Sequence, residues 1–301
     1  MRSTRPISVF AGTALVLSIA ATALGAPITI NTSYRSLTPG ELVVVTINVE
    51  GAPSSVQVTA FRRAIPAFKT EEGVWQALVG IDLDQRPGSY PVAAEAHIGP
   101  TVLRESRALV VAPRKFPTRT LRVNPAFVNP SPAELTRIRA DQTFLADVYA
   151  RPSPTRLWSA PFVRPVPGEA NSSFGTRSVF NGEPRSPHGG TDFLSPTGTP
   201  IKSPNAGRIV CARDLYFTGN TVIIDHGLGM FSMLAHLSVV GVREGDIVTR
   251  DEIIGQVGAT GRVTGPHLHW AVRMNGARVD PVVVLTIIGQ EPSADQTRTA
   301  P

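Results

Sequence analysis

The sequence predicts an all-β protein made of two successive β-rich units with a helical connector between them. Short runs rich in Val and Ile alternate with turn residues along most of the chain, which contains 26 Gly and 27 Pro. One stretch between the two units has the three- and four-residue apolar spacing of a helix. The length of 301 residues suits about two domains, and 42% hydrophobic residues suffice for their cores.

Residues 1–25 are predicted to be a signal peptide. Arg2 and Arg5 give a positive start, the run 7–24 is apolar, and small residues end it, so cleavage is expected after Gly25. An uncleaved membrane anchor is the alternative, because the apolar run is nearly long enough to span a bilayer. No later segment has this character. The chain is therefore expected to be exported to the periplasm or cell envelope, or secreted, without stable membrane insertion after cleavage.

The net charge indicates which classes of partner the chain can bind, and the cysteine content limits its disulfide chemistry. Removal of residues 1–25 leaves 27 basic and 23 acidic residues, a net charge of +4, which favours anionic surfaces such as a cell wall. No basic block with interleaved aromatic residues is present, so a nucleic-acid partner is not expected. Cys211 is the single cysteine, which excludes an internal disulfide, and its apolar surroundings predict a buried thiol rather than a catalytic one.

Residues 26–112 are predicted to form an immunoglobulin-like β-sandwich. Turn signals such as Pro39-Gly40 and Pro87-Gly88 separate short strand-like runs. The predicted strands are residues 42–49, 56–61, 73–79, 88–97 and 101–111. His97 stands alone at a strand end, where a surface or packing role is expected. The unit contains no catalytic constellation, and spacing the next unit is its expected role.

Residues 113–160 are predicted to be a connector with one helix. Ser131 can cap the helix, Pro132 suits its first turn, and Glu134 completes a capping box. The apolar side chains that follow recur at three- and four-residue steps, at Leu135, Ile138, Leu145 and Tyr149. This stripe is expected to pack on a neighbouring unit, and Pro152 and Pro154 are expected to end the helix.

Residues 161–288 are predicted to be the second β-rich unit, followed by a flexible polar tail at 289–301. Its most informative stretch holds His267 and His269, two residues apart on an expected strand, so that both side chains share one face. Upstream, His188 and Asp192 share a face if their segment is extended. His236 lies in the strand-like run 231–238.

These residues together predict a hydrolytic zinc site. A catalytic zinc ion needs about three protein ligands and one open position. His188 and Asp192 supply a nitrogen and an oxygen, the pair at 267 and 269 supplies a third ligand, and two neutral imidazoles remain to take or give protons. Each histidine alone is more often structural, but their joint occurrence favours a metal. His226, before a Gly-Leu-Gly turn, is expected to be a turn or wall residue.

Residues 170–285 resemble the lysostaphin-type (LytM-like) zinc endopeptidases, which cut peptidoglycan peptides. The matching motifs are 173–177 (SFGTR), 188–193 (HGGTDF), 198–200, 219–227 (GNTVIIDHG), 235–238 (AHLS), 245–248 (GDIV), 254–258 (IGQVG) and 260–269 (TGRVTGPHLH). The resemblance implies a compact antiparallel β-sheet with a groove above it. It does not extend to the N-terminal half.

The resemblance also implies roles at the matching positions. His188, Asp192 and His269 correspond to zinc ligands, and His236 and His267 to two catalytic histidines. One of these would act as a general base, and one would stabilise the oxyanion or protonate the leaving amine; either assignment is open.

Two further residues are candidates for substrate contacts. Asn220 could orient the substrate or make a turn, and Arg177 could bind a carboxylate or form a structural salt bridge.

The implied substrate is peptidoglycan peptides, with glycine bridges and D-amino-acid cross-links both open as the bond cleaved. The alternative is a non-catalytic LytM-like regulator or cell-wall-binding protein. All five metal and catalytic positions are intact, which favours the enzyme. A regulatory partner is not identified by the sequence.

Overall fold

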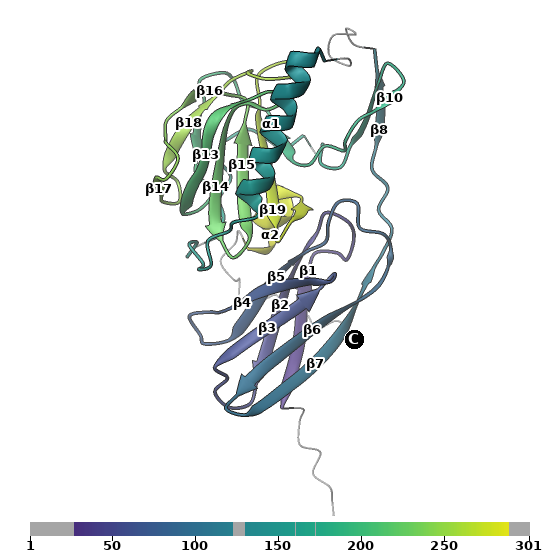
Figure 1. Cartoon of the computed structure of the whole chain (residues 1–301), viewed down its shortest axis with the longest axis vertical. Coiled ribbons are helices and arrows are strands. Elements are labelled where there is room, and N and C mark those ends of the chain that lie inside the picture. Colours follow the sequence, from purple (N-terminus) through teal and green to yellow (C-terminus); the bar gives the residue numbers. More distant parts are fainter. Residues whose placement is uncertain (1–26, 123–129, 160, 172, 289–301) are drawn as a thin grey trace, which may run out of the picture.

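The computed structural model describes residues 27–122, 130–159, 161–171 and 173–288. The predicted signal peptide and the predicted tail lie outside the described residues. Two β-rich units are stacked along the long axis of the molecule, and a helix runs beside the second (Figure 1). Strands dominate the described part of the chain, which contains two α-helices, so the all-β prediction is confirmed. Neither helix there is long and apolar enough to cross a membrane.

The N-terminal unit is a seven-stranded antiparallel sheet that curls around one apolar core. Its strand order is β1-β2-β5-β4-β3-β6-β7. The strands are β1 (Ile28–Tyr34), β2 (Leu42–Val49), β3 (Ser55–Ala60), β4 (Arg63–Lys69), β5 (Trp75–Gly80), β6 (Gly88–Ile98) and β7 (Thr101–Val111). The two end strands approach each other, since Arg107 Nη1 in β7 donates to the Ile30 carbonyl in β1 at 3.4 Å.

Two strands of this unit were not predicted. β1 begins just after the expected signal peptide, and its exposed polar residues alternate with only two buried isoleucines. β4 contains Pro66 and begins and ends with charged residues, which weakens its strand pattern. The immunoglobulin-like class stays a prediction, since what the structure describes is a single curled sheet.

The connector contains the predicted helix and an additional strand. Helix α1 (Pro132–Tyr149) begins with the expected capping box between Ser131 and Glu134. Leu145 and Tyr149 pack on the second unit as expected, Ile138 is buried, and Leu135 is exposed. The additional strand β8 (Thr118–Leu121) pairs in parallel with β9 (Arg177–Phe180), and four residues are too few for a periodic signal.

The C-terminal unit consists of two β-sheets, a short helix and two strands of a third sheet, β10-β9-β8, which it shares with the connector. The main sheet has the order β11-β19-β15-β14-β13-β17, and β20 also pairs with β19. Its strands are β11 (Thr191–Phe193), β13 (Gly207–Leu215), β14 (Gly219–Gly227), β15 (Met230–Ala235), β17 (Ile247–Val248), β19 (Leu268–Met274) and β20 (Ala277–Val279). The second sheet, in the order β12-β18-β16, contains β12 (Pro200–Lys202), β16 (Leu237–Val240) and β18 (Ile253–Val257). β10 (Glu183–Pro184) pairs with β9, and α2 (Pro281–Ile287) follows β20.

Strand β19 is central to this unit because three strands pair with it. β15 pairs along one edge, and β11 and then β20 pair along the other. Trp270 and Val272 of β19 are fully buried in the core. The N-terminal end of β19 is paired on both edges, with β11 and with β15, so side chains there have a rigid backbone.

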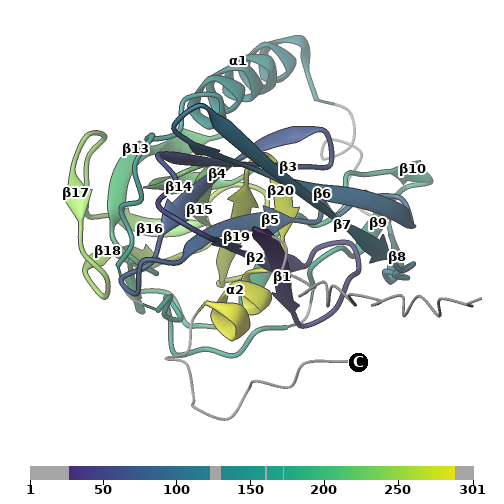
Figure 2. The same ribbon diagram turned by 90° about the horizontal axis from the view of Figure 1, so that it is seen from below.

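The two units share a tightly packed interface. Leu42, Val44 and Leu78, from β2 and β5, belong to the apolar core of the C-terminal unit. Figure 2 shows α2 and β19 next to these two strands. At Gly80 the backbones are so close that an added Cβ would lie 2.9 Å from the Ala277 Cβ. The N-terminal unit is thus fixed against the strands that carry the site.

Candidate metal centre

Strand register brings the predicted site residues to one end of β19. Asp192 in β11 is the direct cross-strand partner of His269, and Ala235 at the end of β15 is the partner of His269 on the other side. His236 follows Ala235 at once, and His267 precedes β19 in a bridge to Gly258. The predicted common face of His267 and His269 is therefore present.

His188 reaches the same place from a loop and not from an extended strand. The expected i and i+4 alternation with Asp192 does not apply, because residues 188–190 lie outside any strand. The loop is instead held by the backbone. The His188 N–H donates to the Thr176 carbonyl at 3.0 Å, and the Gly175 N–H donates to the His188 carbonyl at 2.8 Å. His188 Nδ1 lies 3.2 Å from the Ser173 carbonyl and must donate to it.

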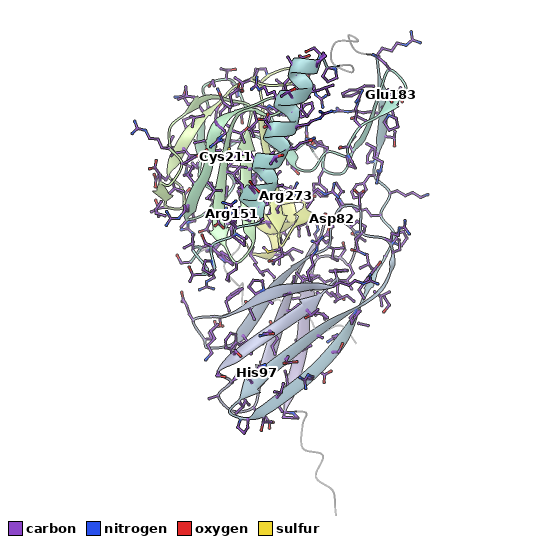
Figure 3. The ribbon with its side chains drawn as sticks, viewed as in Figure 1. Asp82, His97, Arg151, Glu183, Cys211 and Arg273 are labelled. Carbon is purple, nitrogen blue, oxygen red and sulfur yellow. The ribbon has the colours of Figure 1, made fainter. Side chains whose placement is uncertain are left out.

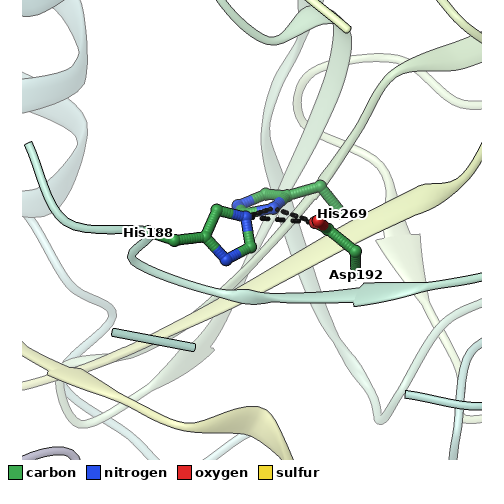
Figure 4. A group of neighbouring side chains, drawn as sticks. All are labelled: His188, Asp192 and His269. Carbon is green, nitrogen blue, oxygen red and sulfur yellow. Dashed lines mark hydrogen bonds and ion pairs between the residues drawn. The ribbon is translucent and has the colours of Figure 1, made fainter. Parts of the chain in front are cut away.

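Three donor atoms converge at one point (Figure 4). His188 Nε2 lies 3.0 Å from His269 Nδ1 and 3.1 Å from Asp192 Oδ1, and the last two atoms are 2.9 Å apart. For zinc bonds of about 2.0–2.1 Å, tetrahedral geometry separates neighbouring ligand atoms by about 3.3–3.4 Å. The triangle fits three corners of such a site after movements of a few tenths of an ångström. The set of two imidazole nitrogens and one carboxylate oxygen also suits zinc.

The protonation of this cluster favours a cation. Because His188 Nδ1 carries the hydrogen, its Nε2 presents a lone pair to the carboxylate and to His269 Nδ1. Burial raises the pKa of Asp192, but the contacts of its carboxylate with the imidazoles of His188 and His269 outweigh burial and hold that pKa well below its usual range. Burial lowers the pKa of His269. An anionic oxygen and two imidazole nitrogens that face one point form a set that a divalent ion would satisfy.

Two further imidazoles lie beside the triangle with one nitrogen each facing the backbone. His267 Nδ1 is 2.9 Å from the Gly265 carbonyl, and His236 Nδ1 is 2.9 Å from the Thr260 carbonyl. Both Nδ1 atoms must donate, which leaves each Nε2 to accept a proton. His267 Nε2 lies 3.6 Å from Asp192 Oδ1. The ring centroids of His236 and His267 are 4.9 Å apart.

The prediction that His236 lies within a strand is wrong. β15 ends at Ala235, and His236 has a φ of +68°, which is uncommon for a residue with a side chain. Its N–H donates to the Thr218 carbonyl at 2.9 Å, which holds this turn. Burial, followed by the charge of His269, lowers the pKa of His236 to about 4. The left-handed backbone ends the strand pairing and turns the imidazole toward the cluster.

The two candidate substrate residues are engaged in internal contacts. Asn220 Nδ2 donates to the Leu237 carbonyl at 3.1 Å, and its N–H donates to Thr260 Oγ1 at 2.9 Å, so that it supports the turn at His236. Arg177 Nη2 lies 3.1 Å from Asp84 Oδ1 of the N-terminal unit, with both side chains about half exposed. The salt bridge that the sequence left open for Arg177 is thus present.

His226 and Cys211 lie apart from the cluster. His226 is fully buried, with Nδ1 2.8 Å from the Ala206 carbonyl and Nε2 2.9 Å from Ser232 Oγ. It is therefore a core residue and not a wall residue, as its apolar strand neighbours could have indicated. Cys211 is a buried free thiol, as expected. His97, far along the chain in β6, pairs with Glu95 at 3.1 Å.

Two further residues, Ser173 and Gly190, support the cluster, and the sequence did not indicate the role of Ser173. Ser173 Oγ lies 3.4 Å from Asp192 Oδ2, while its carbonyl orients His188, so one residue contacts two members of the cluster. Gly190 packs so closely that an added Cβ would lie 2.5 Å from the Trp270 carbonyl oxygen and 2.8 Å from the His269 ring. Both lie within the matched motifs at 173–177 and 188–193, which was the available signal.

Comparison with known proteins agrees with this geometry. The model of the family described as Peptidase family M23 matches residues 186–281. A crystal structure described as a putative peptidase M23 from Pseudomonas aeruginosa is 34% identical, with a TM-score of 0.66, over 85% of this chain and 96% of that chain. The chain belongs to peptidase family M23. The matched range 186–281 includes the three residues of the triangle, His188, Asp192 and His269, and the two histidines beside it, His236 and His267.

Curated relatives are similar to about a third of the chain. Peptidoglycan DD-endopeptidase ShyA of Vibrio cholerae is 44% identical over 94 residues, which are 31% of this chain and 22% of ShyA. DD-carboxypeptidase/endopeptidase Mpg of Neisseria meningitidis is 41% identical over 113 residues, which are 38% of this chain and 26% of Mpg. The matched part therefore spans about a quarter of the length of these relatives.

Proposed function

We propose that this M23 protein is an exported zinc-dependent endopeptidase that hydrolyses peptide bonds in peptidoglycan. The observation that carries the proposal is the triangle of donor atoms, 2.9–3.1 Å on a side, with two further histidines beside it. Family membership and the names of the curated relatives support the same reaction class.

In this proposal His188 Nε2, Asp192 Oδ1 and His269 Nδ1 hold the zinc ion. When bound, the ion supplies Lewis-acid chemistry, in that it polarises a carbonyl group or a water molecule. Asp192 contributes the negative charge that offsets part of the charge of the ion. The Ser173 carbonyl fixes the tautomer of His188, so that its Nε2 lone pair faces the ion.

His236 and His267 would transfer protons during hydrolysis. Their Nδ1 hydrogens are held by the carbonyls of Thr260 and Gly265, which fixes both rings and keeps both Nε2 atoms available. One Nε2 would take a proton from the attacking water, and the other would stabilise the oxyanion or give a proton to the leaving amine.

The favoured substrate is a D,D-cross-link between peptidoglycan stem peptides. ShyA and Mpg, which are similar to about a third of this chain, are both named for activity on DD bonds. Asn220 and Arg177 remain proposed substrate contacts, although the Arg177–Asp84 salt bridge supports the structural alternative for Arg177. A role as a non-catalytic regulator is disfavoured, because all five metal and catalytic positions are occupied by competent side chains. Residues 1–25 would direct the protein to the cell envelope.

Zinc analysis and digestion of purified sacculi test the proposal. The purified protein should contain about one zinc ion per chain, and Asp192→Ala should lose it. Release of muropeptides should fall by at least about 100-fold in His236→Ala and in His267→Ala. His97→Ala is the matched control and should retain the parental rate. Equal rates for all the variants would contradict the assignment, and mass spectrometry of the products would identify the bond cleaved.

A further inference from the structure

The N-terminal unit contributes two carboxylates to the M23 unit. Asp82 and Asp84 lie in the loop after β5, and Figure 3 shows Asp82 at the junction between the two units. Arg278 of β20 receives both: its Nη2 lies 2.6 Å from Asp82 Oδ1 and 2.8 Å from Asp84 Oδ2, and its Nε lies 3.1 Å from Asp82 Oδ2. The Arg278 N–H also donates to Asp82 Oδ2 at 2.9 Å. Such a bidentate pair fixes both position and orientation.

These contacts end at the loop that carries His188. The Cδ of Arg278 is the nearest atom to the space beside Gly189, 3.7 Å from where a Cβ would lie. Asp84 Oδ1 also binds Arg177, which directly follows Thr176, the residue that accepts the His188 N–H. Through Arg278 and Arg177, the two carboxylates of the N-terminal unit therefore contact two segments beside His188: the one that follows it and the one that accepts its N–H.

A second contact between the same two segments lies two residues after Gly189 in one and two residues after Arg278 in the other. β20 continues the edge of β19 that β11 begins, so residues after β20 lie beside residues before β11. Thr191 Oγ1, next to Asp192, donates to Asp280 Oδ1 at 3.1 Å in a buried position. The Asp280 N–H in turn donates to the Gly40 carbonyl of the N-terminal unit at 2.9 Å. The segment 189–191 thus rests on residues 278 and 280, and these rest on the N-terminal unit.

His188 is the donor in the triangle that needs this support. Asp192 and His269 are cross-strand partners, and the sheet fixes their separation. His188 lies outside any strand, so its position depends on what packs around its loop. Loss of residues that orient metal ligands typically weakens metal binding by about 10–100-fold.

We propose that Asp82 and Asp84 are positioning residues for His188, and that the N-terminal unit thereby sets the affinity of the metal site. The unit is then part of the metal centre and not only a spacer, which was its expected role. This inference rests on the ligand set of the proposed function. It concerns binding of the ion and not the chemistry that follows.

The test compares zinc affinities of the full chain by competition with a chromophoric chelator, without substrate. Asp82→Asn/Asp84→Asn keeps the side-chain shapes and removes both charges, and it should bind zinc at least about 10-fold more weakly than the parent. Glu95→Gln/Asp214→Asn is the matched control. It also removes two carboxylates from arginine ion pairs, those with Arg104 and Arg137, and should stay within about 2-fold of the parent.

The outcomes separate this inference from the proposed function. Excess zinc should restore muropeptide release by the double variant to the parental rate, which damage to the catalytic histidines would not allow. A parent and a double variant that bind zinc with equal affinity would overturn this inference alone. A parent that binds no zinc would overturn both proposals. If the double variant does not fold, Asp84→Asn gives the same comparison, with an expected weakening of a few-fold.

Discussion

Replacement of Gly190 by alanine is expected to damage the metal centre through a steric effect alone. An added Cβ would lie 2.5 Å from the Trp270 carbonyl oxygen and 2.8 Å from Cε1 and Nε2 of His269. The backbone of Gly190 does not have a positive φ, so alanine meets no conformational penalty there. The methyl group and the His269 imidazole would compete for the same space.

The size of the effect follows from these distances. An ordinary contact between carbon atoms is about 3.5 Å, so the imidazole would have to move by about 0.7 Å. β19 pairs along both edges and cannot yield, which directs the movement into the side chain. Functional groups need placement within about 0.5 Å, so zinc affinity should fall at least about 10-fold. Overpacking should also lower the free energy of unfolding by about 1–3 kcal/mol.

Gly189→Ala is the matched control for this prediction. Its Cβ would meet only the Arg278 Cδ, at the ordinary distance of 3.7 Å, so zinc affinity should stay within about 2-fold of the parent. Chelator competition measures both variants, and urea titration of the metal-free proteins measures their stability. The steric reasoning would be refuted if Gly190→Ala bound zinc like the parent, or if the two neighbouring variants lost affinity equally.

Three further outcomes are expected. Burial lowers the pKa of His226 from 6.5 to about 4, so on acidification the unfolded chain takes up this proton before the folded protein does. The contribution of His226 to the free energy of unfolding is therefore intact above about pH 6.5 and falls by about 3 kcal/mol toward pH 4. Urea titrations of parent and His226→Gln at pH 7.5 and 4.5 measure this, and equal pH dependence would contradict it. Ser131→Ala removes the cap of α1 and should lower the free energy of unfolding by about 1 kcal/mol, measured against Thr136→Ala, which keeps the cap. Burial raises the pKa of Cys211 to about 12, so a thiol reagent should label the native protein far more slowly than the denatured protein.

Local patterns in the sequence predicted the site where local geometry decides it. The shared face of His267 and His269 depends only on an extended backbone, which β19 and the bridge at His267 supply. The capping box at Ser131 and Glu134 is likewise a short-range device, and the structure contains it. His236 was placed correctly beside the cluster through the family resemblance, although the expected strand geometry was wrong.

Long-range partners lay beyond what the sequence pattern could indicate. Nothing near Arg177 or Arg278 marks their carboxylate partners, which come almost 100 and 200 residues earlier in the chain. The position of the His188 loop depends on these contacts and not on its own periodicity. The strand β8 and the close approach at Gly80 are also products of tertiary packing.

Strand β2 has consequences for how the protein can be divided. Val43 and Val45 face the core of the N-terminal unit, while Leu42 and Val44 on the opposite face are buried in the M23 core. A fragment limited to the matched residues 186–281 would lack Leu42 and Val44, so the apolar side chains that they cover would be exposed to water. The M23 unit is therefore expected to be unstable when it is expressed alone, and both units should unfold in a single thermal transition.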